Sequence, residues 1–182
     1  MTPNAASIAP ESTEFAAYYG KYTSRVKSDD IVATLENQIR NTQSLLGSVS
    51  EAESEFRCAP DKWNIRQMLG HVIDTERIFS YRALRIGRGD KTPIEGFEQD
   101  DYVRNASFER RSVADLLAEF ETVRRATVFL FRSLDAQAWS RRGIASQNEV
   151  TVRALAYIIA GHELHHMEVL RQKYLPALKA SR

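Results

Sequence analysis

The sequence TVRALAYIIAGHELHHMEVLRQKY spans residues 151–174 and carries a helical pattern. Its apolar residues recur three or four positions apart, as on the buried face of an amphipathic helix. They are Val152, Leu155, Ile158, Ile159, Val169 and Leu170. Pro176 is expected to end this helix, because the residue before a proline is disfavoured in the helical conformation. Three of the four histidines in the chain lie inside the segment: His162, His165 and His166.

Three further segments show the same spacing, at about residues 29–46, 64–86 and 112–134. No segment alternates between apolar and polar residues over the length of a strand. Eight glycines and five prolines are few for 182 residues, which also favours long helices. The sequence therefore predicts an all-α protein, most simply a four-helix bundle. A shorter aromatic helix is expected over about residues 14–26.

The connections between the predicted helices are uneven in length. About 17 residues join the first two helices, and about 25, residues 87–111, separate the second from the third. So long a link either forms the wall of a functional site or crosses over to place its helices parallel, and both interpretations stay open. Residues 1–13 are expected to be a flexible tail, and residues 14–182 a single domain.

Charge and cysteine content exclude several classes of protein. Lysine and arginine total 25 against 24 acidic residues, a net charge of +1, so there is no electrostatic case for nucleic acid or an anionic membrane surface. No apolar run approaches the ~18 residues that cross a bilayer. Cys58 is the only cysteine, which rules out an internal disulfide and a thiolate zinc cage. We expect a cytoplasmic protein that acts on a small molecule.

The histidine cluster is best interpreted on a helical wheel. His162 and His166 lie about 40° apart, one turn above the other, near the middle of the apolar stripe. His165 falls roughly 90° from its centre. Two imidazoles so placed can reach one metal ion, which would satisfy nitrogens that are costly to bury unpaired. The alternative is an ordinary pair of hydrogen-bonded core histidines.

Three residues of the second helix are weaker candidates. His71 flanks the apolar stripe, and if it met the other two histidines the site would have three nitrogen ligands and an open position, as catalytic sites do. Glu76 lies near the centre of the stripe and needs a partner, most commonly an arginine. Arg82 shares a face with His71 and could meet an anionic substrate, although a solvated surface position is the commoner arrangement. Glu76 and Arg82 are the candidate catalytic residues.

The run His162-Glu163-Leu164-His165-His166 also matches the His-Glu-x-x-His pattern of metalloproteases, in which the glutamate is the general base. This interpretation is weak, because no sheet precedes the helix and the third histidine lies far upstream.

Two motifs resemble the DinB/YfiT-like family. The first is PDKWNIRQMLGH at residues 60–71, followed by DTER at 74–77, and the second is GHELHH at residues 161–166. The resemblance extends over about residues 25–178, including the long link between the second and third helices. It implies a bundle with an up-down-down-up course.

The resemblance also implies a metal site and a range of functions. One divalent ion, zinc or nickel first, would be held by His71, His162 and His166, with His165 a neighbour. Related families include transferases that use low-molecular-weight thiols, and dimers are common. We therefore expect a metal-dependent thiol S-transferase in stress response or detoxification. The alternatives are a hydrolase that uses water activated by the metal, and a non-enzymatic metal-binding bundle.

Overall fold

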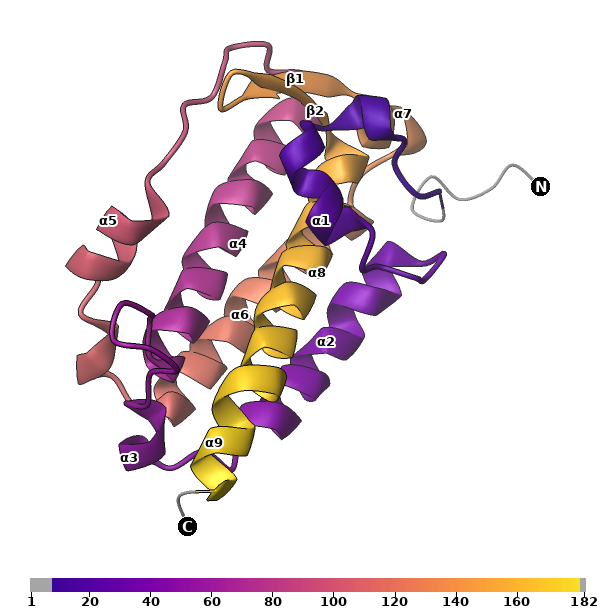
Figure 1. The fold of residues 1–182 in the computed structure, drawn as a ribbon. Coiled ribbons are helices and arrows are strands. Elements are labelled where there is room, and N and C mark those ends of the chain that lie inside the picture. Colours follow the sequence, from indigo (N-terminus) through magenta and orange to yellow (C-terminus); the bar gives the residue numbers. More distant parts are fainter. Residues whose placement is uncertain (1–7, 181–182) are drawn as a thin grey trace.

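Four long helices form the body of the protein in a computed structural model that describes residues 8–180. They are α2 (Ile31–Leu46), α4 (Ile65–Gly87), α6 (Val113–Arg132) and α8 (Val152–Val169). Figure 1 shows α4 and α6 running in one direction, with α2 and α8 in the other. The predicted all-α four-helix bundle with its up-down-down-up course is confirmed.

Each long helix begins at a residue whose side chain accepts a hydrogen bond from the backbone of the first turn. These N-cap residues are Asp30, Asn64, Ser112 and Thr151. Their side-chain oxygens satisfy amides that have no partner within the helix. The caps explain why the helices begin within two residues of the predicted positions.

The bundle interior contains two apolar cores. One gathers around Leu35, Phe79, Phe131 and Leu155, and the other around Leu69, Phe120 and Leu170. Between them along the helices lies a buried polar layer, which we define as Gln38, Thr42, Glu76, Arg124 and Glu163. Each of the four helices contributes to it, so the layer divides the core across its whole width.

The link between α4 and α6 is the crossover that parallel helices require. It runs along the outside of α4 and contains the short helix α5 (Gln99–Asn105) and a 3-10 turn at Phe108–Arg110. The turn docks on α4 at Gly70, where a Cβ atom would lie 2.5 Å from the Phe108 ring. Glycine at this position therefore makes room for the end of the crossover.

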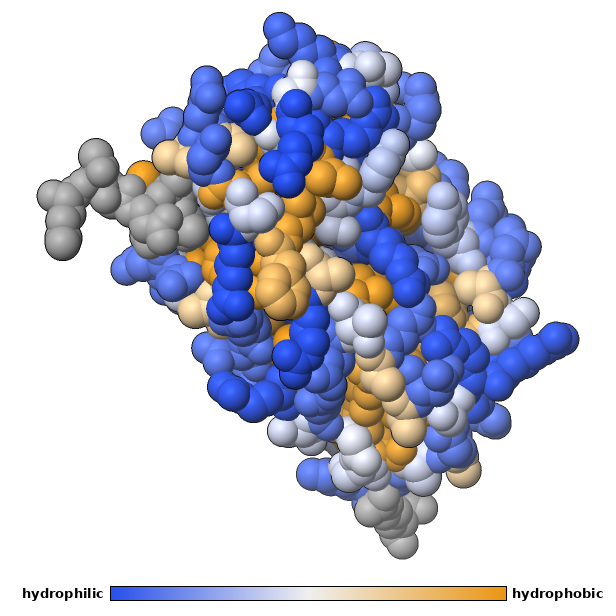
Figure 2. Space-filling view, turned by 180° about the vertical axis from the view of Figure 1, so that it is seen from behind, coloured by the Kyte–Doolittle hydropathy of each residue, from blue (hydrophilic) through white to orange (hydrophobic). Residues whose placement is uncertain are grey.

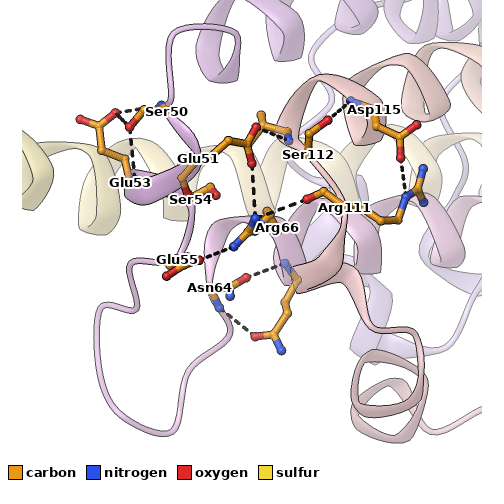
Figure 3. A network of polar contacts seen from close by, with 12 residues as sticks. Ser50, Glu51, Glu53, Ser54, Glu55, Asn64, Arg66, Arg111, Ser112 and Asp115 are labelled. Atoms are coloured by element: carbon orange, nitrogen blue, oxygen red, sulfur yellow. Dashed lines mark hydrogen bonds and ion pairs between the residues drawn. The ribbon is translucent and has the colours of Figure 1, made fainter.

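A polar network ties the first turns of α4 and α6 together at one end of the bundle (Figure 3). Arg66 is 7% exposed and binds the carboxylates of Glu51 and Glu55, of which Glu51 belongs to α3 (Glu51–Ser54). The second oxygen of Glu51 accepts from the amide of Val113 at the start of α6. One arginine and one glutamate thus fix where the two parallel helices begin.

The structure corrects the expectation that the chain holds no strand. Short helix α7 (Ala136–Ser140) is followed by an antiparallel hairpin of β1 (Arg142–Ala145) and β2 (Asn148–Thr151), which covers one end of the bundle. Each strand has only four residues, too few for an alternation of apolar and polar residues to be recognised in the sequence. Its turn residues Ser146 and Gln147 have φ of 49° and 63°, a conformation usually signalled by glycine or asparagine.

Gln147→Gly is expected to stabilise the protein by about 0.5–1 kcal/mol, because glycine adopts a positive φ without the steric cost of a side chain. Thermal unfolding should show a Tm about 1–4 °C higher. Glu149→Gly, in the neighbouring strand, is the control and should lower the Tm. A lower Tm for both variants would show that the turn is not strained.

Two helix boundaries also differ from the predictions. Instead of one helix over residues 14–26 there are 3-10 turns at Ser12–Glu14 and Ala17–Tyr19 and the single-turn helix α1 (Gly20–Thr23), because Phe15 and Ala16 are extended. Pro176 does not end the last helix. A π-helical turn at Leu170–Tyr174 leads into α9 (Leu175–Ala180), and Pro176 lies in the first turn of α9, a position that proline tolerates.

The outer surface is mixed in character. Figure 2 shows the face opposite to that of Figure 1, where hydrophilic residues predominate and apolar residues are visible between them. Among the described residues, the most exposed large apolar side chain is Phe129 on α6, at 70%. Among the described helices, none combines the length and the apolar character that crossing a membrane would require. Of the predicted tail, residues 1–13, the first seven lie outside the described part of the chain, and Ser12 and Thr13 belong to the 3-10 turn at Ser12–Glu14.

Candidate metal centre

Three histidines meet between α4 and α8. The Nε2 atom of His162 lies 3.1 Å from the Nε2 atom of His71 and 3.1 Å from that of His166. Within residues 8–180 these three form the only group of histidine, cysteine or acidic side chains with a metal-ligand arrangement. The structure therefore brings together the three histidines that the resemblance singles out, from positions about 90 residues apart.

The antiparallel packing of α4 on α8 creates this meeting point. His162 and His166 are one turn apart on α8, and their ring centroids are separated by 4.5 Å. His71 faces them from α4, with its ring centroid 4.9 Å from each. The Trp63 ring packs against the His71 ring with centroids 4.6 Å apart, and Thr75 Oγ1 lies 3.4 Å from Nδ1 of His71. These contacts hold the His71 ring with Nε2 toward its partners.

Burial keeps the three imidazoles neutral. It lowers the pKa of His71 to about 4, because the charged form loses its hydration. Burial also lowers the pKa of His162 and His166 far below the ordinary value, and the neighbouring imidazoles lower it further. Neutral imidazole is the form that binds metal ions, so all three rings are available as ligands at neutral pH.

His165 lies outside this group. Its ring packs edge-on against Tyr22, with centroids 5.5 Å apart, and against His166 at 5.1 Å. Its Nδ1 atom has no hydrogen-bond partner among the described residues. This position agrees with the helical wheel, which places His165 off the centre of the apolar stripe.

A cavity of about 710 Å³ opens on His71 and His162. Aromatic rings from three parts of the chain line it: Tyr18, Tyr19, Tyr22, Phe79, Phe97 and Tyr102. Thr75 and Ser146 add hydroxyl groups, and Glu98, Asp100 and Asp101 add carboxylates that are exposed. The link between α4 and α6 therefore forms one wall of the cavity as well as crossing over between parallel helices.

The two glutamates considered from the sequence belong to the polar layer and do not line this cavity. Glu76 Oε1 accepts from Arg124 Nε at 2.8 Å, which is the predicted buried ion pair. Glu163 accepts a hydrogen bond from Thr42 and lies 4.0 Å from Arg124 Nη1. Because Glu163 binds partners on α2 and α6, its position gives no support to the metalloprotease interpretation.

The expectation that Arg82 is a solvated surface residue is wrong. Its side chain is 2% exposed, and its guanidinium donates to the Glu95 carbonyl at 3.0 Å and to Ser146 Oγ at 2.9 Å. Arg82 thereby joins α4 to the crossover and to the hairpin turn. No sequence signal indicates this burial, since both partners come from segments predicted as loops.

Sequence reasoning also missed the role of the N-terminal aromatic residues. Tyr18, Tyr19 and Tyr22 belong to the segment predicted as a short aromatic helix, and the structure places them in the wall of the cavity. The only available signal was their crowding within five residues.

The donor set fits a divalent metal ion. Zinc–nitrogen bonds of about 2.0–2.1 Å in a tetrahedron separate two ligand nitrogens by roughly 3.3 Å. The observed 3.1 Å is close to this separation. The ligand atoms of the three histidines all lie within 4.8 Å of one another. Three neutral nitrogens so close together, with a cavity beside them, are typical of sites that keep a coordination position open.

Comparison with solved structures supports the fold assignment. YfiT from Bacillus subtilis, described as a probable metal-dependent hydrolase with an unusual four-helix bundle topology, is similar with a TM-score of 0.71 and 15% identity. The likeness covers 78% of this chain and 85% of that one. A DinB-like protein from the same organism, YjoA, gives a TM-score of 0.55 at 21% identity, over 78% and 86% of the two chains.

The comparison with curated proteins gives no match. A model of the DinB superfamily matches residues 34–170, about three quarters of the sequence. The matched residues include His71, His162 and His166. The bundle topology, the order of the motifs and this match agree, and the chain is a member of the DinB superfamily.

Proposed function

We propose that His71, His162 and His166 hold one divalent ion, zinc or nickel, and that the protein is a metal-dependent enzyme acting on a small molecule. The convergence of three neutral Nε2 atoms beside an open cavity carries this proposal. The leading reaction is transfer of a low-molecular-weight thiol to an electrophile.

The cavity lining favours a reaction that needs no protein base. Every carboxylate that lines it within the described part of the chain is exposed on the crossover, and the buried Glu76 and Glu163 face the polar layer instead. A divalent ion at the histidines would supply Lewis acidity, lowering the pKa of a coordinating thiol or water. The nucleophile would then be ionised without help from a side chain.

The cavity dimensions suit two small reactants. A volume of about 710 Å³ lies within the roughly 300–1,000 Å³ of small-molecule sites. The aromatic rings along its walls would bury the organic parts of a thiol and an electrophile, and Thr75 would hold His71 in its orientation.

Hydrolysis is the second candidate. YfiT, with the same bundle topology, is described as a probable metal-dependent hydrolase. Water in place of a thiol would use the same ion and the same cavity, so the two candidates differ only in the nucleophile.

One assay separates the candidates. The zinc- and nickel-loaded protein is incubated with 1-chloro-2,4-dinitrobenzene and a panel of thiols, and in parallel with p-nitrophenyl acetate without thiol. Thiol-dependent release of chloride would support transfer, whereas release of p-nitrophenol alone would favour hydrolysis. If the metal-loaded protein releases neither chloride nor p-nitrophenol, the results would favour the non-enzymatic metal-binding bundle.

Trp63 offers a direct signal of metal binding. Its ring lies 4.6 Å from His71, whereas Trp139, the other tryptophan, stacks on Phe131 in the apolar core. Nickel added to Trp139→Phe is therefore expected to quench most of the remaining fluorescence, because a bound paramagnetic ion would lie close to Trp63. Trp63→Phe should respond weakly, and equal responses of the two variants would argue against binding at the histidines.

A homodimer, a cytoplasmic location and a role in detoxification or stress response are further proposals, motivated by the family resemblance and the single cysteine. Sedimentation equilibrium of the full chain tests the dimer, for which a mass of 20.7 kDa would be the contradicting result.

A further inference from the structure

The segment that precedes α2 forms one wall of the cavity, although it lies outside residues 34–170, which the family model matches. Tyr18, Tyr19 and Tyr22 come from its 3-10 turn and from α1. They line the same cavity as His71 and His162.

Two contacts hold this segment against α8. Gly161, next to His162, lets the α1 backbone approach so closely that a Cβ atom there would overlap the carbonyl group of Tyr22. Glu14, which is 3% exposed, accepts from Thr151 Oγ1 at 2.7 Å and pairs with Arg153. The segment is therefore built into the bundle, and its position relative to the histidines is fixed.

Of the three tyrosines in this segment, Tyr22 is the one whose ring contacts a histidine of the site. Its side chain is 6% exposed, and its ring packs edge-on against His162 with centroids 5.2 Å apart. The hydroxyl lies 3.5 Å from that of Tyr18, a distance at the limit of a hydrogen bond. Tyr18 is 60% exposed and its hydroxyl can bind water instead. The Tyr22 hydroxyl can therefore leave this weak contact and donate to a better acceptor.

Two other hydroxyl groups of the cavity have partners already. Thr75 Oγ1 lies beside Nδ1 of His71, and Ser146 Oγ accepts from Arg82. Tyr19 lies edge-on to Phe79, with ring centroids 5.9 Å apart, and not against a histidine.

We infer that Tyr22 donates a hydrogen bond to an oxygen atom of the ligand bound at the histidines. A phenol is a donor at neutral pH, and in a partly dehydrated cavity such a bond strengthens as negative charge develops on the acceptor. Tyr22 would thus orient an oxygen-bearing substrate and stabilise the charge that forms on it. This inference rests on the proposed function, since it requires a metal ion at the three histidines.

The test uses Tyr22→Phe in the cobalt-loaded protein, with acetohydroxamate as the probe and the visible absorption of cobalt as the signal. Removing the hydroxyl is expected to lower the affinity for acetohydroxamate at least tenfold, while the affinity for cobalt stays within about twofold of that of the unmodified protein. Loss of a donor to a charged oxygen commonly costs this much or more. If turnover is found, kcat should fall by about a hundredfold.

Two further variants make the result specific. Tyr81→Phe removes an exposed hydroxyl group of α4 that does not line the cavity, and this variant should bind acetohydroxamate as the unmodified protein does. Gly161→Ala would push the segment that contains Tyr22 away from α8 without replacing a histidine. It should lower the affinity for acetohydroxamate at least as much as Tyr22→Phe does. Unchanged affinity in Tyr22→Phe would overturn this inference alone, whereas failure of the unmodified protein to bind cobalt would overturn the proposed function on which it rests.

Discussion

His162→Ala is expected to abolish binding of a divalent metal, with a loss of affinity of more than about a hundredfold. The Nε2 atom of His162 lies 3.1 Å from both partner nitrogens, so its removal leaves two ligands without their common neighbour. Mutation of a group that only hydrogen-bonds to a metal ligand lowers metal affinity by about 10–100-fold. Loss of a ligand itself should therefore lower the affinity further. Calorimetric titration with zinc measures the change.

His165→Ala is the matched control, since it removes an imidazole from the same turn of α8. Its ring packs on Tyr22 and lies outside the three converging nitrogens, so zinc affinity should stay within about tenfold of the unmodified protein. Equal losses for the two variants would overturn the choice of ligands.

Arg124→Met is expected to destabilise the fold by about 3–5 kcal/mol, the usual cost of removing one partner from a buried ion pair. Arg124 is fully buried and donates to Glu76 at 2.8 Å, to the Leu35 carbonyl at 3.1 Å and to Gln38 at 2.6 Å. Without the guanidinium, Glu76 and Glu163 remain buried with no cation between them. Urea unfolding followed by circular dichroism gives the change in free energy.

Arg125→Met, at the next position on α6, provides the comparison. Arg125 is 63% exposed in its side chain and pairs with Glu121 one turn away, a surface contact usually worth less than 1 kcal/mol. If Arg124→Met cost no more than Arg125→Met, the polar layer would not depend on its arginine.

The polar layer also shows where sequence reasoning reaches its limit. Glu76 stands out in an apolar stripe, so an arginine partner could be predicted, but several arginines were available to supply it. Arg124 was identified only by the packing of α6 against α4. Burial raises the pKa of Glu163 to about 7, while Arg124 acts in the opposite direction, and this balance depends on contacts among all four helices.

The helices themselves followed closely from the sequence. Apolar periodicity and polar N-caps are local signals, and the wheel separated His165 from its two neighbours on α8. The hairpin turn, the burial of Arg82 and the wall formed by Tyr22 were not predictable. The burial of Arg82 and the position of Tyr22 depend on contacts between segments far apart in the chain, for which no local pattern exists. The hairpin is local, but its strands are only four residues long and its turn residues are Ser146 and Gln147 instead of glycine or asparagine.

X-ray absorption at the zinc edge of the protein loaded with one equivalent of zinc tests the three-histidine site most directly. We predict scattering from three imidazole rings, with zinc–nitrogen distances of about 2.0–2.1 Å, and one further light ligand. A spectrum that requires only one imidazole, or a protein that retains no zinc after dialysis, would contradict the assignment of His71, His162 and His166 as a metal centre.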